Sequence, residues 1–217
     1  MAVKKIVFIS DYVCPYCLVA KQALEEAVRE TGIETEIRYL PFELTEEPKE
    51  RVDTYHDEVR KSHYRILEEP CHRMGLDMKL PPNVVPRPYT RLAFEGWLYA
   101  CDHQKGDLYN RLVYLAYFTK EQDIGEIDVL CGIAQEAGLD PGDFRRALQN
   151  GIYTKKEKEA VHSVRETYQV KHVPTIYIDG TEVQIKEYTK EEMIKLLHSR
   201  DDSEGEGFCC SEDGCGF

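Results

Sequence analysis

The sequence predicts an α/β fold in which a small sheet carries a large all-helical insertion. Residues 4–40 are patterned as strand, helix and strand, and residues 174–198 as a hairpin followed by a helix. Between them lie about a hundred residues of helical pattern. With 217 residues, of which 42% are hydrophobic, the chain can bury a core without disulfides or metals as staples.

The first unit contains two strands joined by a helix. Residues 4–9, "KKIVFI", are rich in β-branched residues and predict a short buried strand. A helix is expected from about Pro15 to Glu30, ended by Gly32. Residues 33–40, "IETEIRYL", alternate apolar and polar and predict a second strand with one exposed face. Such a unit places its strands parallel with a right-handed crossover.

The helical pattern begins at Glu43, and Thr45 with Pro48 predicts the first helix start. A proline-rich loop over 80–88, "LPPNVVPRP", cannot be helical. Four more helices are then expected, separated by turns that contain glycine or aspartate: 89–104, 107–120, 126–138 and 140–150.

The last part of the chain returns to mixed structure. After a helix over about 154–169, the segment "PTIYIDGTEVQI" (174–185) has an Asp-Gly turn between two apolar runs, which predicts a hairpin. Thr189 and Glu192 form a capping box for a final helix. The acidic, glycine-bearing tail after Arg200 is expected to be disordered.

The motif "CPYC" places two cysteines where the first strand gives way to the first helix. Pro15 falls in the first helical turn, where proline is favoured. At that helix start, the free amides of Tyr16 and Cys17 and the helix dipole would stabilise a Cys14 thiolate. Cys17 lies one turn later on the same face and is expected to be less exposed. The spacing therefore predicts a redox dithiol, with Cys14 as nucleophile and Cys17 as resolving thiol.

A zinc site is the main alternative for this motif. Structural zinc takes about four ligands, commonly two Cys-x-x-Cys pairs or one pair with two histidines. Neither a second such pair nor a suitably spaced histidine pair is present, and only the tail could add sulfur ligands. The spacing and the helix start favour redox chemistry.

The tail itself is open to three interpretations. Cys210 and Cys215 could form a second dithiol that passes electrons to Cys14 and Cys17. Together with Cys209 they could instead bind a soft metal. A terminus with no role is the third interpretation.

Without the helical block, the order of elements is that of a thioredoxin fold. Pro174, in "KHVPTIYIDG", resembles the proline that this superfamily holds in the cis form against its active-site cysteines. By itself it could be an ordinary strand-start proline. The resemblance implies that the backbone of Val173 is free to pair with a substrate peptide by strand addition. It also implies that a substrate contacts the residues around the motif and the proline, namely Pro15, Tyr16, Val173, Pro174 and Thr175.

The segment "SDYVCPYCLVAK" resembles the active-site segment of the DsbA family, and the helical block resembles that family's insertion. Within the family, residues 112–140 and the loop 81–96 are similar to the FrnE-like subgroup. The resemblance implies a cytosolic thiol–disulfide oxidoreductase or isomerase. It divides the chain as follows: a thioredoxin-like domain over 1–42 and 154–200, a helical insertion over 43–153, and a tail over 201–217.

Two features bear on the direction of exchange. The dipeptide between the cysteines is Pro-Tyr, as in glutaredoxins, and not the Pro-His of periplasmic oxidants. A glutaredoxin-like potential of about −200 to −230 mV would leave the dithiol largely reduced in a glutathione pool near −220 to −260 mV. A reductase or isomerase is therefore expected. It needs no dissociable cofactor, and glutathione or a thioredoxin-type system would regenerate the dithiol.

The compartment and the partners follow from composition. No apolar run is long enough to span a bilayer, and the first ten residues lack a signal-peptide core, which predicts a reducing cytosol and mostly free thiols. A net charge of −12 argues against nucleic acid. The expected partner is a disulfide-containing protein or peptide, and glutathione is a further candidate.

Two rival functions stay open. One is a glutathione-dependent reductase or isomerase of small molecules with the same fold; the branch of that kind carries serine at the first cysteine position, which argues against it here. The other is a non-enzymatic soft-metal-binding thiol protein. Cys71, Cys101 and Cys131 are expected to be small buried hydrophobic residues, and the aromatic residues of the helical block are expected to form its core.

Overall fold

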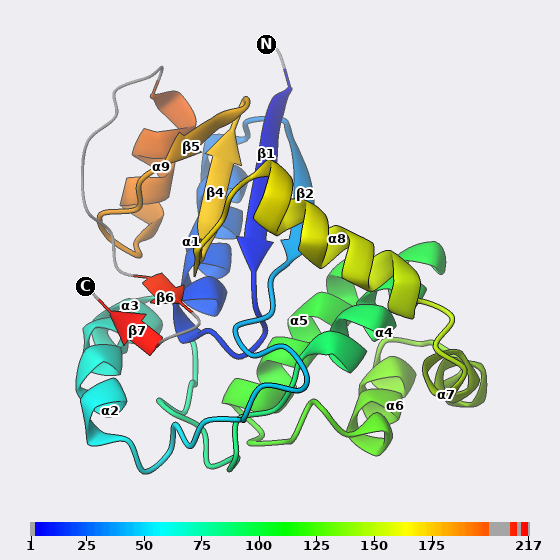
Figure 1. Ribbon diagram of the computed structural model, residues 1–217. Coiled ribbons are helices and arrows are strands. Elements are labelled where there is room, and N and C mark those ends of the chain that lie inside the picture. The colour runs from blue at the N-terminus through cyan, green and yellow to red at the C-terminus, as the bar shows by residue number, and fades with distance from the viewer. Residues whose placement is uncertain (1–2, 200–208, 212–213, 217) are drawn as a thin grey trace.

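The computed structural model describes residues 3–199, 209–211 and 214–216 (Figure 1). Its main sheet has the strand order β2-β1-β4-β5. These strands are β1 (Lys4–Ser10), β2 (Thr35–Pro41), β4 (Thr175–Ile178) and β5 (Thr181–Val183). β1 pairs parallel with β2 and antiparallel with β4, which in turn pairs antiparallel with β5. The expected strand order along the chain, and with it the predicted α/β class, is confirmed.

Helices cover both faces of this sheet. α1 (Pro15–Thr31) packs with α9 (Lys190–His198), and α8 (Thr154–Thr167) crosses β2 on the other side (Figure 1). The buried side of α1 has apolar residues at helical spacing, including Ala20, Ala23, Leu24 and Ala27. The helix ends as predicted at Gly32, which has a φ of 65°.

The hairpin and the final helix cap also match their predictions. Asp179 and Gly180 have φ values of 51° and 87°, as the two central residues of a tight turn between β4 and β5 require. The Thr189 side chain accepts a hydrogen bond from the amide of Glu192 at the start of α9.

The segment between β2 and α8 is helical. It consists of α2 (Glu58–Tyr64), η1 (Arg65–Leu67), α3 (Glu68–Arg73), α4 (Arg91–Asp102), α5 (Gly106–Phe118), α6 (Ile127–Glu136) and α7 (Pro141–Gln149). The expected aromatic core is confirmed for six side chains, which are buried: Phe94, Tyr99, Tyr109, Tyr114, Tyr117 and Phe118. Trp97 is only partly buried. None of the helices in the described part of the chain is long and apolar enough to cross a membrane.

The predicted helix start at Thr45 is wrong. The described residues 42–57 hold no helix, and α2 begins only after Asp57. The Thr45 hydroxyl accepts a hydrogen bond from the buried Arg87 guanidinium at 2.8 Å, so it serves a long-range contact and not a cap. The Asp57 side chain accepts from the amides of Val59 and Arg60 and is the real cap.

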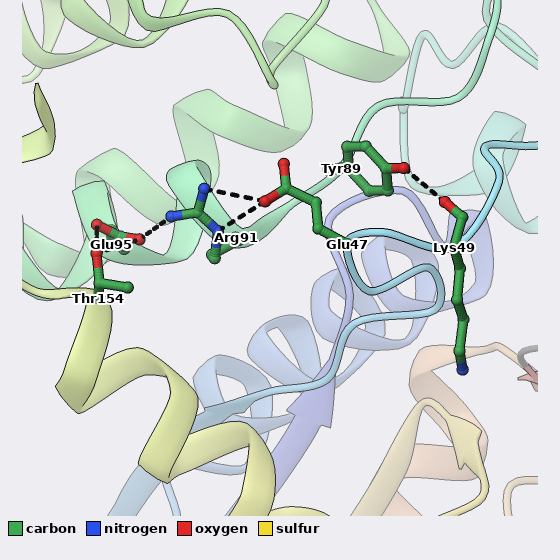
Figure 2. A network of polar contacts seen from close by, with 6 residues as sticks. All are labelled: Glu47, Lys49, Tyr89, Arg91, Glu95 and Thr154. Carbon is green, nitrogen blue, oxygen red and sulfur yellow. Dashed lines mark hydrogen bonds and ion pairs between the residues drawn. The ribbon is translucent and has the colours of Figure 1, made fainter. Parts of the chain in front are cut away.

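A polar network holds this non-helical segment against the helices (Figure 2). Arg91, on α4, lies between Glu47 and Glu95 and bonds to both carboxylates. The Thr154 hydroxyl, at the start of α8, donates to Glu95 at 3.0 Å. The Glu95 carboxylate therefore connects α4 with α8. The Arg91 guanidinium connects this carboxylate with Glu47 in the loop after β2.

A second, three-stranded sheet pairs the residues directly before Pro174 with two strands near the C-terminus. β3 (His172–Val173) pairs antiparallel with β6 (Cys209–Ser211), and β6 pairs antiparallel with β7 (Gly214–Gly216). Figure 1 shows β6 and β7, in red, beside the lower end of β4 and next to α2. Disorder is predicted for 201–217, and apart from these two strands that tail lies outside the described residues.

Candidate active site

Cys14 lies at the start of α1, as its motif predicts. It is the N-cap residue, with φ −91° and ψ 114°, and Pro15 takes the first helical position. The predicted hydrogen bonds from backbone amides to the sulfur are wrong: among the described residues none caps the Cys14 side chain, and the amide of Cys17 donates to the Cys14 carbonyl at 3.1 Å. The thiol instead donates to the carbonyl oxygen of Val173 at 3.6 Å.

Cys17 is held as a thiol next to Cys14. Burial raises its pKa well above the ordinary value, and the neighbouring Cys14 sulfur raises it further. Both cysteines are 0% exposed, so the expected difference in exposure between them is absent. A buried thiol that stays protonated at neutral pH suits a residue that acts only after Cys14 has formed a mixed disulfide.

Pro174 is cis, as its resemblance to the superfamily proline implies. Val173 and Thr175, on either side of it, are 0% and 4% exposed. The Thr175 hydroxyl donates to the carbonyl of His172 at 2.8 Å. β4 begins at Thr175, opposite Ile9 of β1, and this pairing brings the proline loop to the end of the strand that leads into Cys14.

Tyr16 occupies the position between the two cysteines as part of the core. Its ring is 1% exposed and packs against Tyr64 and Tyr188, with ring centroids 6.2 and 5.3 Å away. Its hydroxyl donates to the carbonyl of His63 at 3.1 Å. Its neighbour Pro15 is buried as well.

The structure therefore brings together all five predicted substrate-contact residues and both motif cysteines. The other two predicted site residues, Cys210 and Cys215, are described only through the backbones of β6 and β7. The side chains of Cys209, Cys210 and Cys215, and with them the predicted tail metal site, lie outside the described residues.

Asp11 is a site residue that the sequence analysis missed. Its side chain is 0% exposed, and one carboxylate oxygen accepts from the Leu44 amide at 2.7 Å. The other oxygen, Oδ1, has no hydrogen-bond partner among the described residues. Burial raises the Asp11 pKa, and its charge in turn raises the pKa of Cys17. Its place three residues before Cys14, at the end of a buried strand, was the available signal.

Two further buried acids, Glu43 and Glu157, lie near Asp11. Glu43 precedes Leu44, the residue whose amide binds Asp11, and its carboxyl group interacts electrostatically with that of Glu157 on α8. Burial raises the pKa of Glu43 to about 9 and that of Glu157 to about 7. Repulsion between the two negative charges raises the Glu43 pKa as well. At neutral pH Glu43 is therefore the protonated member of the pair.

The remaining described cysteines match their prediction in part. Cys71 and Cys131 are buried, as expected, whereas Cys101, in the last turn of α4, is exposed. Among the side chains that the structure describes, those of residues 3–199, no group of three or more metal-binding histidine, cysteine, aspartate or glutamate residues comes together.

Fold and site together define a thioredoxin-fold protein with a helical insertion, whose paired cysteines open a helix and face a cis-proline loop. The chain belongs to the DSBA-like thioredoxin domain family, whose model matches residues 5–195. This result confirms the resemblance to the DsbA family and supports the class of thiol–disulfide oxidoreductases.

The protein YwbO of Bacillus subtilis (strain 168), described as uncharacterized, is 38% identical over 173 residues, which cover 79% of this chain and 85% of that protein. A probable DsbA oxidoreductase from Streptomyces coelicolor has a similar structure, with a TM-score of 0.71, 18% identity and 99% coverage of both chains.

Two further solved structures share the fold. The cytosolic disulfide reductase DsbM from Pseudomonas aeruginosa gives a TM-score of 0.61 at 16% identity, covering 89% of this chain and 96% of that one. A 2-hydroxychromene-2-carboxylate isomerase gives 0.68 at 17% identity, covering 88% of this chain and 92% of that one. This similarity confirms the predicted thioredoxin fold with its helical insertion.

Proposed function

We propose that this protein is a cytosolic thiol–disulfide exchange enzyme that reduces or isomerises disulfides through Cys14 and Cys17. One observation carries the proposal: the Cys14 sulfur lies at a helix start, 3.6 Å from the carbonyl of Val173 and beside cis-Pro174. Cys17 lies one turn along the same helix. An attacking sulfur, a resolving thiol and a backbone edge for a peptide are thus within one site.

The first step is attack of the Cys14 thiolate on one sulfur of a substrate disulfide. The new bond joins Cys14 to that sulfur, the substrate S–S bond breaks, and the other substrate sulfur leaves as a thiolate and takes up a proton. The product is a mixed disulfide between enzyme and substrate.

Cys17 then completes the exchange. Its thiol passes a proton to the Asp11 carboxylate and attacks the Cys14 sulfur, which releases the second substrate sulfur. The substrate has gained two electrons and the enzyme now holds a Cys14–Cys17 disulfide. Two thiols of glutathione, or a thioredoxin-type reductant, restore the dithiol.

The substrate is a disulfide-bearing peptide segment in extended form. The backbone of Val173 pairs with β6 in this structure, and strand addition of a substrate there requires β6 to leave that edge. Pro174 cannot donate an amide hydrogen that would compete for the thiolate. Pro15, Tyr16 and Thr175 shape the same site. The ring of Tyr16 is packed inside the protein and acts on the substrate through the backbone that it holds in place.

The reducing direction is supported by the Pro-Tyr dipeptide and by the buried, protonated Cys17. The name of the similar protein DsbM, a cytosolic disulfide reductase, agrees with it. In a cytosolic glutathione pool the resting enzyme would be a dithiol.

The test is a redox titration of the purified protein in glutathione buffers, with alkylation and mass spectrometry of Cys14 and Cys17. We expect one two-electron transition of this pair near about −200 to −230 mV. Cys131→Ser, a buried cysteine of α6, should leave the transition unchanged, and Cys14→Ser should abolish it. If both cysteines resist alkylation until a chelator is added, the pair is a metal site and the proposal is wrong.

The similarity to an isomerase structure favours one second candidate, a glutathione-dependent isomerase of small molecules. The variant Cys14→Ser distinguishes disulfide exchange from isomerisation of a small molecule. A Cys14→Ser variant that keeps glutathione-dependent turnover would support the isomerase, because that chemistry does not need a sulfur nucleophile there. Loss of all turnover together with the redox transition supports disulfide exchange.

A further inference from the structure

Three sulfur-bearing side chains are close together in the sequence just after α3, outside the candidate active site. The segment 71–78, "CHRMGLDM", contains Cys71, Met74 and Met78, and therefore two of the four methionines in the whole chain. The thiol of Cys71 donates a hydrogen bond to Sδ of Met78, and the two sulfur atoms are 3.5 Å apart. Two soft donor atoms thus face each other across this part of the chain.

A turn at the end of α3 brings Met78 back to Cys71. The amide of Leu76 donates to the Cys71 carbonyl at 2.8 Å. The amide of Gly75 donates to the His72 carbonyl at 3.2 Å. This pair of bonds is the Schellman arrangement, which needs a left-handed residue after the helix, and Gly75 supplies it with a φ of 64°. The chain therefore reverses here and returns to the helix that it has just left.

The far end of the turn is fixed to the end of α5. The Thr119 hydroxyl donates to the carbonyl of Asp77 at 2.7 Å. The amide of Lys79 donates to the carbonyl of Phe118, also at 2.7 Å. These two bonds hold the residues on either side of Met78. The contact between the two sulfur atoms is thus supported by backbone bonds, and an ion bound there would cost little reorganisation.

Met74 supplies a third sulfur on the same side of α3. It follows Cys71 by three residues, and side chains at this spacing share a helix face, with Cβ atoms about 5 to 6 Å apart. Met74 and Met78 are half-buried and pack against the hydrophobic core, whereas Cys71 is buried. The two methionine side chains are flexible and partly exposed, which leaves a path for a small ion to the buried thiol.

The separation of the two sulfur atoms suits one shared metal ion. Bonds from a metal ion to cysteine sulfur are about 2.3 Å long. Two bonds of this length to atoms 3.5 Å apart enclose an angle of about 100°, which is close to the tetrahedral angle. A metal ion would take the place of the thiol hydrogen that lies between the two sulfur atoms.

The available ligands favour a soft ion. Thiolate and thioether sulfur suit Cu(I), whereas magnesium and calcium need oxygen ligands. Two carboxylates of this region already have partners: Asp77 pairs with Lys79 at 3.1 Å, and Glu69 pairs with Arg73. Structural zinc takes about four ligands from cysteine, histidine and carboxylates, and the described side chains hold no group of even three of these.

Charge distinguishes a monovalent ion from a divalent one. One thiolate and two neutral thioethers carry a single negative charge, which cancels the charge of Cu(I). A divalent ion with the same ligands would leave a net positive charge in a buried position, and an unpaired buried charge is costly. The neutral complex fits the burial of Cys71.

We propose that Cys71, Met74 and Met78 form a binding site for one Cu(I) ion. Binding replaces the S–H bond of Cys71 with a Cu–S bond, the proton goes to solvent, and the ion keeps its oxidation state. Burial raises the pKa of Cys71 to about 11, so the thiol keeps its proton until a soft ion displaces it. The site shares no residue with the candidate active site and does not depend on the proposed function.

The test uses the full-length chain with serine at positions 14, 17, 209, 210 and 215, because the thiols of the motif and the tail would compete for the ion. Methionine is labelled with ¹³C in its methyl group, and one equivalent of Cu(I) is added in the absence of oxygen. The methyl signals of Met74 and Met78 should shift in the NMR spectrum. The signal of Met193, which is buried in α9, should stay in place.

Competition with the Cu(I) chelator bicinchoninate measures the affinity. In the same background, Cys71→Ser should weaken binding by about a hundredfold or more, because even changes outside the ligand shell cost about 10- to 100-fold. The matched control Cys131→Ser removes another buried thiol and should leave the affinity unchanged.

Met78→Leu provides a second variant that folds, because leucine and methionine exchange in cores at little cost. It should weaken binding by about tenfold or more, whereas Met193→Leu should have no effect. An affinity that survives Cys71→Ser, or a bound ion that leaves both methyl signals in place, would place the ion at another thiol and overturn the proposal. A shift of Met78 without one of Met74 would contradict the three-sulfur site.

Discussion

The Cys14 sulfur donates a hydrogen bond to the carbonyl oxygen of Val173, 159 positions further along the chain. This bond belongs to the thiol form, because a thiolate has no hydrogen to donate and is repelled by a carbonyl oxygen. Ionisation of Cys14 therefore removes this contact between the start of α1 and the cis-Pro174 loop.

Asp11→Asn should slow the resolving step and spare the first attack. The asparagine oxygen can still accept from the Leu44 amide, so the fold is kept, but the proton acceptor for Cys17 is lost. Loss of general base catalysis costs about a hundredfold or more. Rapid-quench experiments with a disulfide peptide should show the mixed disulfide accumulating.

The same substitution should lower the pKa of Cys17, because the negative charge of Asp11 contributes to its elevation. Alkylation of Cys17 against pH would show this shift. Asp128→Asn, an exposed acid of α6 paired with Arg145, is the control and should change neither readout. An unchanged resolving rate in Asp11→Asn would rule out Asp11 as proton acceptor.

Glu43→Gln should stabilise the protein at alkaline pH. Burial raises the Glu43 pKa from 4.5 to about 9, so the folded state binds a proton that the unfolded chain has lost, and stability falls as pH rises between these values. The slope reaches up to about 1.4 kcal/mol per pH unit. Glutamine keeps the size and polarity of the protonated carboxyl group and removes the titration.

Urea unfolding from pH 5 to 9 measures this effect. The wild-type free energy of unfolding should decrease across the range, and the Glu43→Gln curve should be flatter. Glu36→Gln, on an exposed position of β2, should follow the wild type. Parallel curves for wild type and Glu43→Gln would contradict the raised pKa.

Gly96→Ala should destabilise the helical insertion. An added Cβ would lie 2.7 Å from Cζ of Phe144 and closer still to the Tyr109 hydroxyl, and both rings are fully buried. Overpacking of this kind costs about 1 to 3 kcal/mol. Thermal unfolding should show the lower midpoint.

Gly132→Ala is the matched control in α6. No described heavy atom lies within 4 Å of its added Cβ, so the better helix propensity of alanine should raise stability by about 0.5 to 1 kcal/mol. Equal effects of the two substitutions would show that propensity, and not packing, governs position 96.

Thr154→Val should weaken the contact between α8 and α4. It removes the hydroxyl that donates to the fully buried Glu95 carboxylate, which leaves Arg91 as the donor on that side (Figure 2). A buried acceptor that loses a partner costs about 1 to 3 kcal/mol. Thr167→Val, at an exposed position of the same helix, should be nearly neutral in urea unfolding. A loss as large at Thr167 would point to helix propensity.

Local signals in the sequence were sufficient to predict most helices and strands and the position of the cysteine motif at a helix start. A β-branched run before Cys14, Pro15 in the first helical turn, Gly32 after the last, and Asp179-Gly180 in the hairpin each act on the backbone over a few residues. These local backbone preferences do not depend on tertiary contacts, so the amino-acid sequence alone predicts them.

The tertiary structure alone decided the features that depend on distant partners. Thr45 has the side chain of a helix cap, yet Arg87 takes its hydroxyl, and Asp57 caps the helix instead. Asp11 is one acidic residue among many in the sequence, and only the fold shows that it is buried and that its charge raises the pKa of Cys17. The pairing of Val173 with Cys210 depends on strand register between segments that no local pattern relates. Burial, electrostatic environment and register are properties of the assembled chain, and for that reason the sequence by itself left them open.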